Sequence, residues 1–270
     1  MNSHLRPGTA TPPGLHEYLL RQVLPHYFRA GGRALDLGAG SGALALQLQE
    51  AGWTVIAADR DSSGFRAGVP FVQIDFEQPD FASELGRASF DLVTSVEVIE
   101  HLENPIGFLR NISRLLKPDG VALLTTPNVD STPARIKFLL RGTIRMMDAQ
   151  SEKEHITPIF WDLFTRQYLP RAALRLLDHR LYPEHGYQLT RPGRAVLLRL
   201  LSPLLSGDSL YGDNHIIVVG AITGPHEEGA YLATSKDKMP ELPARSGRRM
   251  PHAHITARAF SLPLRLPPRQ

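Results

Sequence analysis

The chain has 270 residues, of which 42% are hydrophobic, and it carries a formal net charge of +3. This length and composition suit one sizeable domain, and the mild basic balance lacks the dense basic stripe of a nucleic-acid-binding protein. The chain contains no cysteine, which excludes disulfides, thiolate metal sites and cysteine nucleophiles. We find no signal-peptide core and no run of the roughly 18–20 apolar residues that span a membrane, so we expect a cytoplasmic protein.

Apolar strands and helical patterns alternate through the first half of the chain. Residues 15–28 predict a short helix that is interrupted near Pro25. Asn104 and Pro105 have the residue types of an N-cap and a first helical position. Strands alternating with helices of this length indicate a parallel, doubly wound α/β sheet. The expected strands are 33–38, 53–59, 71–75, 90–98 and 121–128, with helices at 41–52 and 104–117 and a turn at 118–120.

The pattern loosens after Asn128. Residues 131–160 are mixed, basic and amphipathic. Residues 224–270 hold seven prolines, eight Lys or Arg residues and no long apolar period, which predicts a disordered tail. Further helices are expected at 159–178 and 194–205, and further strands at 180–189 and 214–223. We therefore divide the chain into a flexible N-terminus at 1–14, one domain at 15–223 with an insert at 131–160, and a basic, proline-rich tail at 224–270.

The stretch LDLGAGSG, residues 35–42, has the composition of a nucleotide-binding turn. Glycines between a strand and a helix let a ligand approach the backbone, and the helix N-terminus offers unpaired N–H groups. Gly38-x-Gly40-x-x-Ala43, with Asp59 about 20 residues on, also fits a dinucleotide fingerprint. Asp36, however, would repel a pyrophosphate and suits a cationic ligand such as S-adenosylmethionine. A tight turn without a ligand, and a capping role for Asp36, are the alternatives.

Five motifs in order resemble the class I S-adenosylmethionine-dependent methyltransferases, over roughly residues 15–223. They are LDLGAGSG, IAADR, IDFE, FDLVTSVEVIEHLENP and LLKPDGVALLTTPN. EVIEHLENP is closest to the small-molecule branch that includes ubiquinone O-methyltransferase-like enzymes. TPN, FLLRG and EHITPI resemble, more loosely, bacterial methyltransferases associated with surface-glycan or lipid-linked sugar assembly. The resemblance implies a Rossmann-like, doubly wound, seven-stranded sheet that is mostly parallel with an antiparallel last strand.

The resemblance also implies how the cofactor is bound. The family's second-strand acid, here Asp59, holds both ribose hydroxyls, and Asp75 lies where the adenine amino group is contacted. The glycines let the methionine part pass the backbone, and Asp36 helps to hold it directly or through water. A solvated strand end is the alternative for Asp59 and for Asp75. The expected cofactor-binding residues are Asp36, Gly38, Ala39, Gly40, Gly42, Asp59, Arg60, Asp75, Phe76, Ser95 and Glu97.

Candidate catalytic groups follow the fourth strand. Methyl transfer needs alignment and desolvation, and a hydroxyl acceptor also benefits from a base. His101 is the first candidate, His155 from the insert the second, and Glu97 the third. Their alternatives are local packing or capping for His101, lid packing for His155, and hydrogen bonds to backbone N–H groups for Glu97. Glu100 fits a helix-start charge, and Asn128 is a further polar group at the end of the fifth strand.

No set of His, Asp and Glu has complete metal-ligand spacing, so we predict no metal. The sequence predicts an S-adenosylmethionine-dependent methyltransferase that acts, preferably at oxygen, on a small molecule, a glycan or a lipid-linked sugar. A quinone or an aromatic or polyketide-like metabolite is the alternative acceptor. The basic insert suits an anionic or lipid-carried acceptor, or is an ordinary lid.

The remaining alternatives concern other classes of protein. An NAD(P)-dependent oxidoreductase is disfavoured because the chain lacks a Tyr-x-x-x-Lys pair. The resemblance also implies that the expected strands 180–189 and 214–223 form an antiparallel hairpin, which a dehydrogenase lacks. A binding protein that keeps the cofactor fold without turnover is the third class. We expect no nucleic-acid partner and no membrane span. Peripheral membrane contact, and a monomer or homodimer, remain open.

Overall fold

A seven-stranded sheet organises the chain, in the order β3-β2-β1-β4-β5-β7-β6. The computed structural model describes residues 11–29, 31–148, 155–188 and 211–222. β1 to β5 run parallel, whereas β7 is antiparallel to both of its neighbours, β5 and β6. This arrangement confirms the expected doubly wound sheet with an antiparallel last strand. The strands are β1 Arg33–Leu37, β2 Thr54–Asp59, β3 Phe71–Gln73, β4 Phe90–Val96, β5 Leu116–Pro127, β6 Leu174–Tyr182 and β7 Asn214–Ala221.

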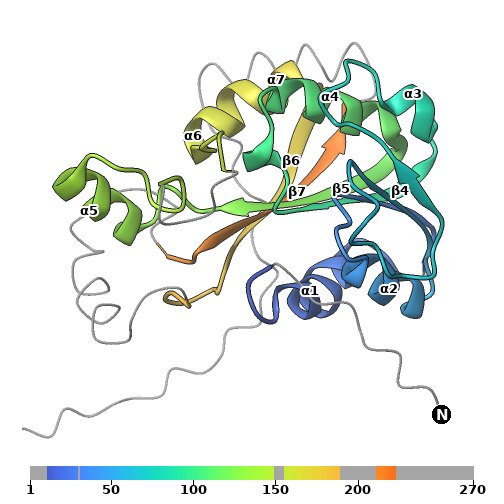
Figure 1. Ribbon diagram of the computed structural model, residues 1–270, viewed down its shortest axis with the longest axis horizontal. Coiled ribbons are helices and arrows are strands. Elements are labelled where there is room, and N and C mark those ends of the chain that lie inside the picture. Colours follow the sequence, from blue (N-terminus) through green and yellow to red (C-terminus); the bar gives the residue numbers. More distant parts are fainter. Residues whose placement is uncertain (1–10, 30, 149–154, 189–210, 223–270) are drawn as a thin grey trace, which may run out of the picture. The chain divides into compact units, whose positions relative to one another are not determined.

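Helices cover both faces of the sheet (Figure 1). α1 and α2 lie on one face, α3, α4, α6 and α7 lie on the other, and α5 lies beyond the end of β5. π-helical or 3-10 turns extend α1 through 19–26, link α6 to α7 through 164–168, and form the short turn 99–101. The helices are α1 Leu15–Tyr18, α2 Ala43–Glu50, α3 Ala82–Leu85, α4 Pro105–Leu115, α5 Thr132–Arg141, α6 Trp161–Leu163 and α7 Leu169–Arg171.

The central strands are buried on both faces because helices pack against each side. Side chains alternate between the two faces, so neighbouring residues of one strand enter different cores. On β4, Val93 packs in the core under α4 while Leu92 packs in the core under α1 and α2. On β5, Leu124 and Leu123 divide in the same way. This double burial explains why the strands appear in the sequence as almost continuous apolar runs.

Three predicted boundaries are wrong. β5 begins at Leu116, so the turn expected at 118–120 falls within the strand. The helix expected at 159–178 ends at Arg171, and the strand expected at 180–189 instead runs from Leu174 to Tyr182. β6 is an edge strand, and its mostly half-buried side chains give no clear period in LRLLDHRLY. The helix expected at 194–205 and the tail at 224–270 lie outside the described residues.

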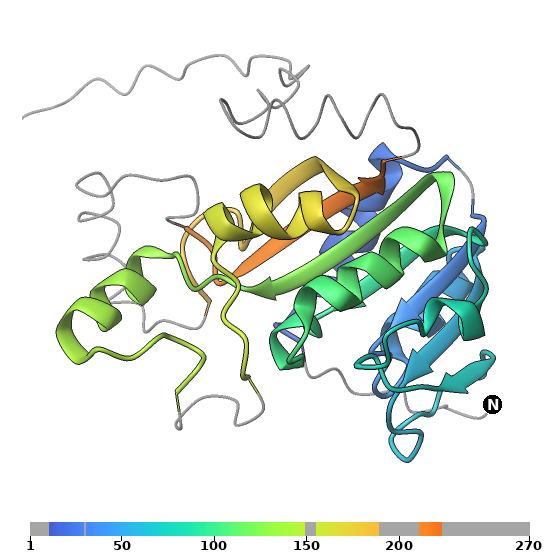
Figure 2. The same cartoon turned by 90° about the horizontal axis from the view of Figure 1, so that it is seen from above.

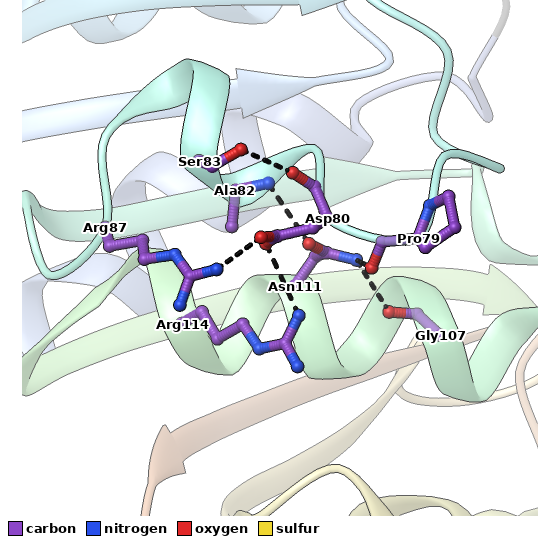
Figure 3. Close-up of polar contacts among 8 residues, drawn as sticks. All are labelled: Pro79, Asp80, Ala82, Ser83, Arg87, Gly107, Asn111 and Arg114. Carbon is purple, nitrogen blue, oxygen red and sulfur yellow. Dashed lines mark hydrogen bonds and ion pairs between the residues drawn. The ribbon is translucent and has the colours of Figure 1, made fainter.

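A buried asparagine holds α4 against the loop that precedes α3 (Figure 3). Asn111 Oδ1 accepts a hydrogen bond from the Ala82 N–H at 3.1 Å. Its Nδ2 donates to the carbonyl oxygens of Pro79 and Gly107, at 3.2 and 3.0 Å. Asp80, beside it, forms ion pairs with two arginines that are largely exposed and therefore contribute little stability. The asparagine thus fixes the helix that follows the carboxyl end of β4.

α4 begins where Asn104 and Pro105 predicted a helix N-terminus. Asn104 is the N-cap, and its Oδ1 accepts a hydrogen bond from the Gly107 N–H at 2.9 Å. Pro105 occupies the first turn, where its missing N–H costs no helical hydrogen bond. Among the helices that the structure describes, none has the length and apolar character to cross a membrane.

Candidate active site

The glycine loop joins β1 to α2 at the carboxyl edge of the sheet. The N–H groups of Gly38 and Ala39 donate to the Ala58 carbonyl of β2, at 2.9 and 3.2 Å. These bonds hold the loop against the end of the neighbouring strand. The carboxyl ends of parallel strands are where open α/β sheets bind ligands. The loop therefore lies where the sequence predicted a cofactor.

The three glycines of the loop have different surroundings. All three have positive φ, between +52° and +84°. A Cβ at Gly38 would lie 2.2 Å from Val98 Cγ2, and one at Gly42 would lie 2.5 Å from the Ala67 Cβ. A Cβ at Gly40 would have no atom within 4 Å. Gly38 and Gly42 are thus required by packing, whereas Gly40 borders open space in which a ligand can approach the backbone.

Asp59 supports the loop from the end of β2. Its Oδ2 accepts a hydrogen bond from the Gly40 N–H at 2.8 Å, and its Oδ1 accepts one from the Asp61 N–H at 3.2 Å. Asp59 is half-exposed, so the remaining lone pairs of its carboxylate are available to a ligand. This support of the Gly40 backbone was not anticipated from the sequence.

Asp36 is a buried carboxylate with one unsatisfied oxygen. The residue is 2% exposed, and its Oδ1 accepts a hydrogen bond from the Thr94 hydroxyl at 2.7 Å. Its Oδ2 is buried without a hydrogen-bond partner. Burial raises the pKa of Asp36 to about 7, against the opposing effects of the Thr94 hydroxyl and the Ala45 backbone N–H. A cationic ligand group beside Oδ2 would satisfy this carboxylate, which agrees with the sulfonium and ammonium groups of S-adenosylmethionine.

Other expected cofactor residues lie at the same edge in varied environments. Asp75 is exposed after β3, and its Oδ1 accepts a backbone hydrogen bond two residues further on. Phe76 is buried, and its ring packs 5.5 Å from that of Phe81, so this side chain serves the core. Ser95 is buried on β4 with no hydrogen-bond partner for Oγ. Arg60 is exposed just beyond β2.

Glu97, directly after β4, is held by two neutral donors. The Thr125 hydroxyl donates to Oε1 at 2.7 Å, and the Asn214 Nδ2 donates to Oε2 at 2.8 Å. Glu97 has a φ of +56°, a strained value for a residue with a side chain, and such strain is concentrated at functional sites. Burial raises the pKa of Glu97 to about 7. A carboxyl group with this pKa can exchange a proton near neutral pH.

Sequence reasoning missed the two donors to Glu97. Thr125 belongs to β5 and Asn214 to β7, so neither is near Glu97 in the sequence. A signal was nevertheless present, because both are polar residues close to the apolar run of their strand. Asn128, an expected candidate, instead donates to the Tyr211 carbonyl at 2.8 Å and supports the segment that leads into β7.

Glu100 is fully buried, so the expectation that it is a helix-start charge is wrong. The 3-10 turn at 99–101 precedes the start of α4, and Glu100 belongs to that turn. Its Oε2 accepts a hydrogen bond from the Thr126 hydroxyl at 3.0 Å, and its Oε1 is buried without a partner. Burial, and secondarily the nearby Glu97 carboxylate, raises the pKa of Glu100 well above its usual range.

His101 and His155 meet although they come from different segments. Their ring centroids lie 4.7 Å apart in an edge-to-face arrangement. The N–H groups of Ile156 and Thr157 donate to the Glu100 carbonyl at 3.0 and 2.9 Å, which brings His155 to this edge. The His155 Nδ1 lies 2.8 Å from the Met146 carbonyl oxygen, which leaves its Nε2 for other contacts.

Glu100, His101 and His155 form a group with metal-ligand spacing. Each offers one ligand atom, and these atoms lie within 4.8 Å of one another. Two imidazoles and a carboxylate are a donor set that divalent transition metals accept. This set was not recognised in the sequence, because its third member, His155, lies far along the chain from Glu100 and His101. The same three groups also allow proton transfer without a metal.

The fold and the glycine loop can now be compared with known proteins. A family model described as a methyltransferase domain matches residues 14–177, which is more than half of the chain. The chain belongs to the S-adenosylmethionine-dependent methyltransferases. The match covers the glycine loop, the second-strand acid and the turn that carries Glu100 and His101. The family expected from the five motifs, and its cofactor, are thereby confirmed.

Curated relatives of this methyltransferase are named ubiquinone biosynthesis O-methyltransferase. The relative from Rickettsia canadensis is 30% identical over 118 residues, which are 42% of this chain and 50% of the relative. The relative from Dinoroseobacter shibae is 31% identical over 137 residues, which are 46% of this chain and 55% of the relative. The relative from Xanthomonas oryzae pv. oryzae is 35% identical over 121 residues, 42% of this chain and 49% of the relative. The matched part thus spans about half the length of these relatives.

Solved structures support the fold of this methyltransferase. A SAM dependent methyltransferase from Archaeoglobus fulgidus aligns with a TM-score of 0.52 at 17% identity, covering 76% of this chain and 91% of that chain. A putative methyltransferase from Haloferax volcanii, solved with its Trm112 activator, aligns with a TM-score of 0.51 at 17% identity, covering 77% and 91%. At such identity the likeness concerns the fold alone.

Proposed function

We propose that this methyltransferase transfers the methyl group of S-adenosylmethionine to an oxygen of a small-molecule or glycan acceptor, lipid-linked sugars included. The observation that carries the proposal is the gathering of Glu97 and His101 directly after β4, with His155 brought beside them. These groups lie at the same edge of the sheet as the glycine loop, where the methyl group would be presented.

The cofactor side of the proposal rests on the loop and its two acids. Gly40 borders open space, so the methionine part of the cofactor can pass against its backbone. Asp36 would hold the cationic part through its unsatisfied Oδ2. Asp59, already bonded to the Gly40 N–H, would accept the ribose hydroxyls. When bound, S-adenosylmethionine supplies an electrophilic methyl group, so the protein has to align the acceptor and exclude water.

His101 is the proposed base for an acceptor hydroxyl. Bound S-adenosylmethionine would supply the methyl group to the acceptor oxygen, and its sulfur would keep the electron pair of the carbon–sulfur bond. The hydroxyl proton has to leave, and a neutral imidazole can take it. The raised pKa of Glu97 makes this carboxyl group a second place for the proton. The edge-to-face contact with His155 positions the His101 ring.

A quinone precursor or another aromatic metabolite is the second candidate acceptor. The curated relatives are named for ubiquinone biosynthesis. Their similarity to 42–46% of this chain supports a phenolic acceptor. A phenol and a sugar both present a hydroxyl to the same base. They differ in the groups that recognise the rest of the acceptor.

Formation of S-adenosylhomocysteine, measured with catechols, prenylated phenols, nucleotide sugars and lipid-linked sugars, tests the proposal. We expect turnover with at least one hydroxyl acceptor, and a loss of about 100- to 10,000-fold in His101→Gln. His26→Gln, a change at an exposed histidine of the N-terminal turns, is the matched control and should keep full turnover. Cofactor binding without turnover on any acceptor would contradict the proposal and favour a binding protein. Full turnover in His101→Gln would exclude His101 as the base.

A further inference from the structure

Large exposed hydrophobic side chains are concentrated in one part of the described chain. Leu139 is 82% exposed, Leu140 is 75% exposed and Phe138 is 57% exposed. Single exposed hydrophobic residues are ordinary, but a local concentration of them marks an interaction surface. Within the ranges that the structure describes, the exposed large hydrophobic residues all lie between positions 138 and 163. They are Phe138, Leu139, Leu140, Ile156, Phe160 and Leu163.

Three of these residues form the last turn of α5. The helix starts in contact with the domain, since Thr132 and Ala134 are buried. It ends at Gly142, whose φ is +67° and whose N–H donates to the Phe138 carbonyl at 2.8 Å. Consecutive helical residues are separated by about 100°, so positions 138 to 140 cover more than half of the circumference. We call residues 138–141 the α5 tip, and Figure 2 shows it directed away from the sheet.

The α5 tip is apolar on several sides and is accompanied by positive charge. Residues 131–148 contain the four basic residues Arg135, Lys137, Arg141 and Arg145 and the single acid Asp148. Lys137 pairs with Asp148 and Arg145 pairs with Asp213, whereas Arg141 is exposed directly after Leu140. Apolar side chains that enter the acyl boundary, with cations at the headgroups, are the combination by which helices bind anionic membranes.

The α5 tip also belongs to the segment that leaves the candidate active site. α5 begins five residues after the end of β5, at the carboxyl edge of the sheet. The same segment continues to Met146, whose carbonyl oxygen holds His155 beside His101. A surface that contacts the α5 tip is therefore linked through one short stretch of chain to the groups that would handle the acceptor.

We propose that the α5 tip docks this methyltransferase on an anionic lipid bilayer, where it meets a lipid-carried acceptor. Leu139 and Leu140 enter the acyl boundary, and Arg141 lies among the phosphates. The inference rests on the proposed methyl transfer and adds the place where the acceptor is met. Docking at a lipid surface accounts for an exposed apolar tip that ends in the exposed Arg141. A second copy of the same surface would bring like charges together.

Vesicle co-sedimentation of the full chain tests the proposal, with phosphatidylcholine vesicles that contain or lack phosphatidylglycerol. We expect binding to the anionic vesicles and much weaker binding to the neutral ones. The L139S/L140S double variant should lower the partition coefficient at least about tenfold, because it removes the apolar contacts while leaving every charge in place. Arg141→Glu should lower it about tenfold through charge reversal near the surface.

Arg175→Glu is the matched charge control, since Arg175 is exposed at the start of β6, at the opposite edge of the sheet. It should bind anionic vesicles as the wild type does. Vesicle binding that L139S/L140S leaves unchanged would overturn the proposal and assign binding to charge elsewhere in the chain. A dimer that L139S/L140S converts to a monomer, without vesicle binding, would overturn it in favour of a contact between copies.

The same variants separate this inference from the proposed function. L139S/L140S should retain its affinity for S-adenosylhomocysteine and its turnover on a water-soluble acceptor. Loss of turnover with a lipid-carried acceptor alone would support the docking role. Absence of turnover on every acceptor in the wild type would refute the proposed function while leaving the vesicle result as the test of the α5 tip.

Discussion

Asp36 offers the sharpest test of how the site recognises a cation. Its Oδ2 is buried without a hydrogen-bond partner, and burial raises the pKa of Asp36 to about 7. A cationic group of S-adenosylmethionine placed against this oxygen would restore an ordinary carboxylate pKa. Binding would then have to release the proton that the free protein holds at acidic and neutral pH.

The size of the effect follows from the raised pKa of Asp36, which burial brings to about 7. At pH 6 about ten free molecules in eleven carry the proton, and at pH 8 about one in eleven does. Affinity for S-adenosylmethionine should therefore rise about tenfold between pH 6 and pH 8. The Asp36→Asn variant keeps the shape of the side chain but has no proton to release, so its affinity should be lower at pH 8 and independent of pH.

Isothermal titration calorimetry in two buffers of different ionisation enthalpy measures the released proton directly. We expect release of about 0.9 proton at pH 6 and about 0.1 at pH 8 in the wild type, and none in Asp36→Asn. Glu97 is the rival source of the proton, because its pKa is also raised to about 7. We expect Glu97→Gln to release the same number of protons on binding as the wild type. Release that persists in Asp36→Asn, or affinity that does not change with pH in the wild type, would refute the role given to Asp36.

Three further predictions concern other parts of the site and the core. Asp59→Ala should weaken binding of S-adenosylhomocysteine by about 1.5–3 kcal/mol in calorimetry, the range for charged hydrogen bonds, and equal affinity would contradict this. Turnover should survive a chelator, because we assign His101 to proton transfer. Turnover that a chelator abolishes and Mn²⁺ or Zn²⁺ restores would contradict this and would make Glu100, His101 and His155 a metal site. Burial lowers the pKa of His179 to about 4 and lowers that of its partner His215 well below its usual value. Their contribution to the free energy of unfolding is therefore present above pH 6.5 and lost as the pH falls toward 4. The Trp161 ring stacks on His179 with the ring centroids 3.6 Å apart, so Trp161 fluorescence reports acid unfolding. His179→Gln should lose less stability than the wild type as the pH falls, and an identical acid transition would count against this role of His179.

The parts of the fold that local signals specify could be predicted from the sequence. The glycine spacing after an apolar run predicted the strand, loop and helix that now form β1, the open turn and α2. Asn104 and Pro105 marked the start of α4 correctly, because a cap is a contact between near neighbours. β6 was misplaced because an edge strand with half-buried side chains has no strong period.

Contacts between distant segments could not be predicted. Glu97 with Asn214, and His101 with His155, depend on how β7 and the insert pack against the end of β4. The position of Glu100 was misjudged because the helix-start signal belongs to Asn104, and the preceding turn is too short to recognise in a sequence. The motifs thus located the edge of the sheet and many of its residues, and the packing decided which side chains meet there.

The central claim is that S-adenosylmethionine binds across the open space at Gly40. Calorimetry with S-adenosylhomocysteine on Gly40→Val and Gly52→Val tests it most directly. Gly52 is the matched control, because it also has a positive φ of +91° and a Cβ there would likewise have no atom within 4 Å. Gly52 follows the C-terminal end of α2, which faces away from the glycine loop. We expect the wild type and Gly52→Val to bind S-adenosylhomocysteine, and Gly40→Val not to bind it. Equal binding by Gly40→Val and the wild type would exclude a cofactor position across Gly40.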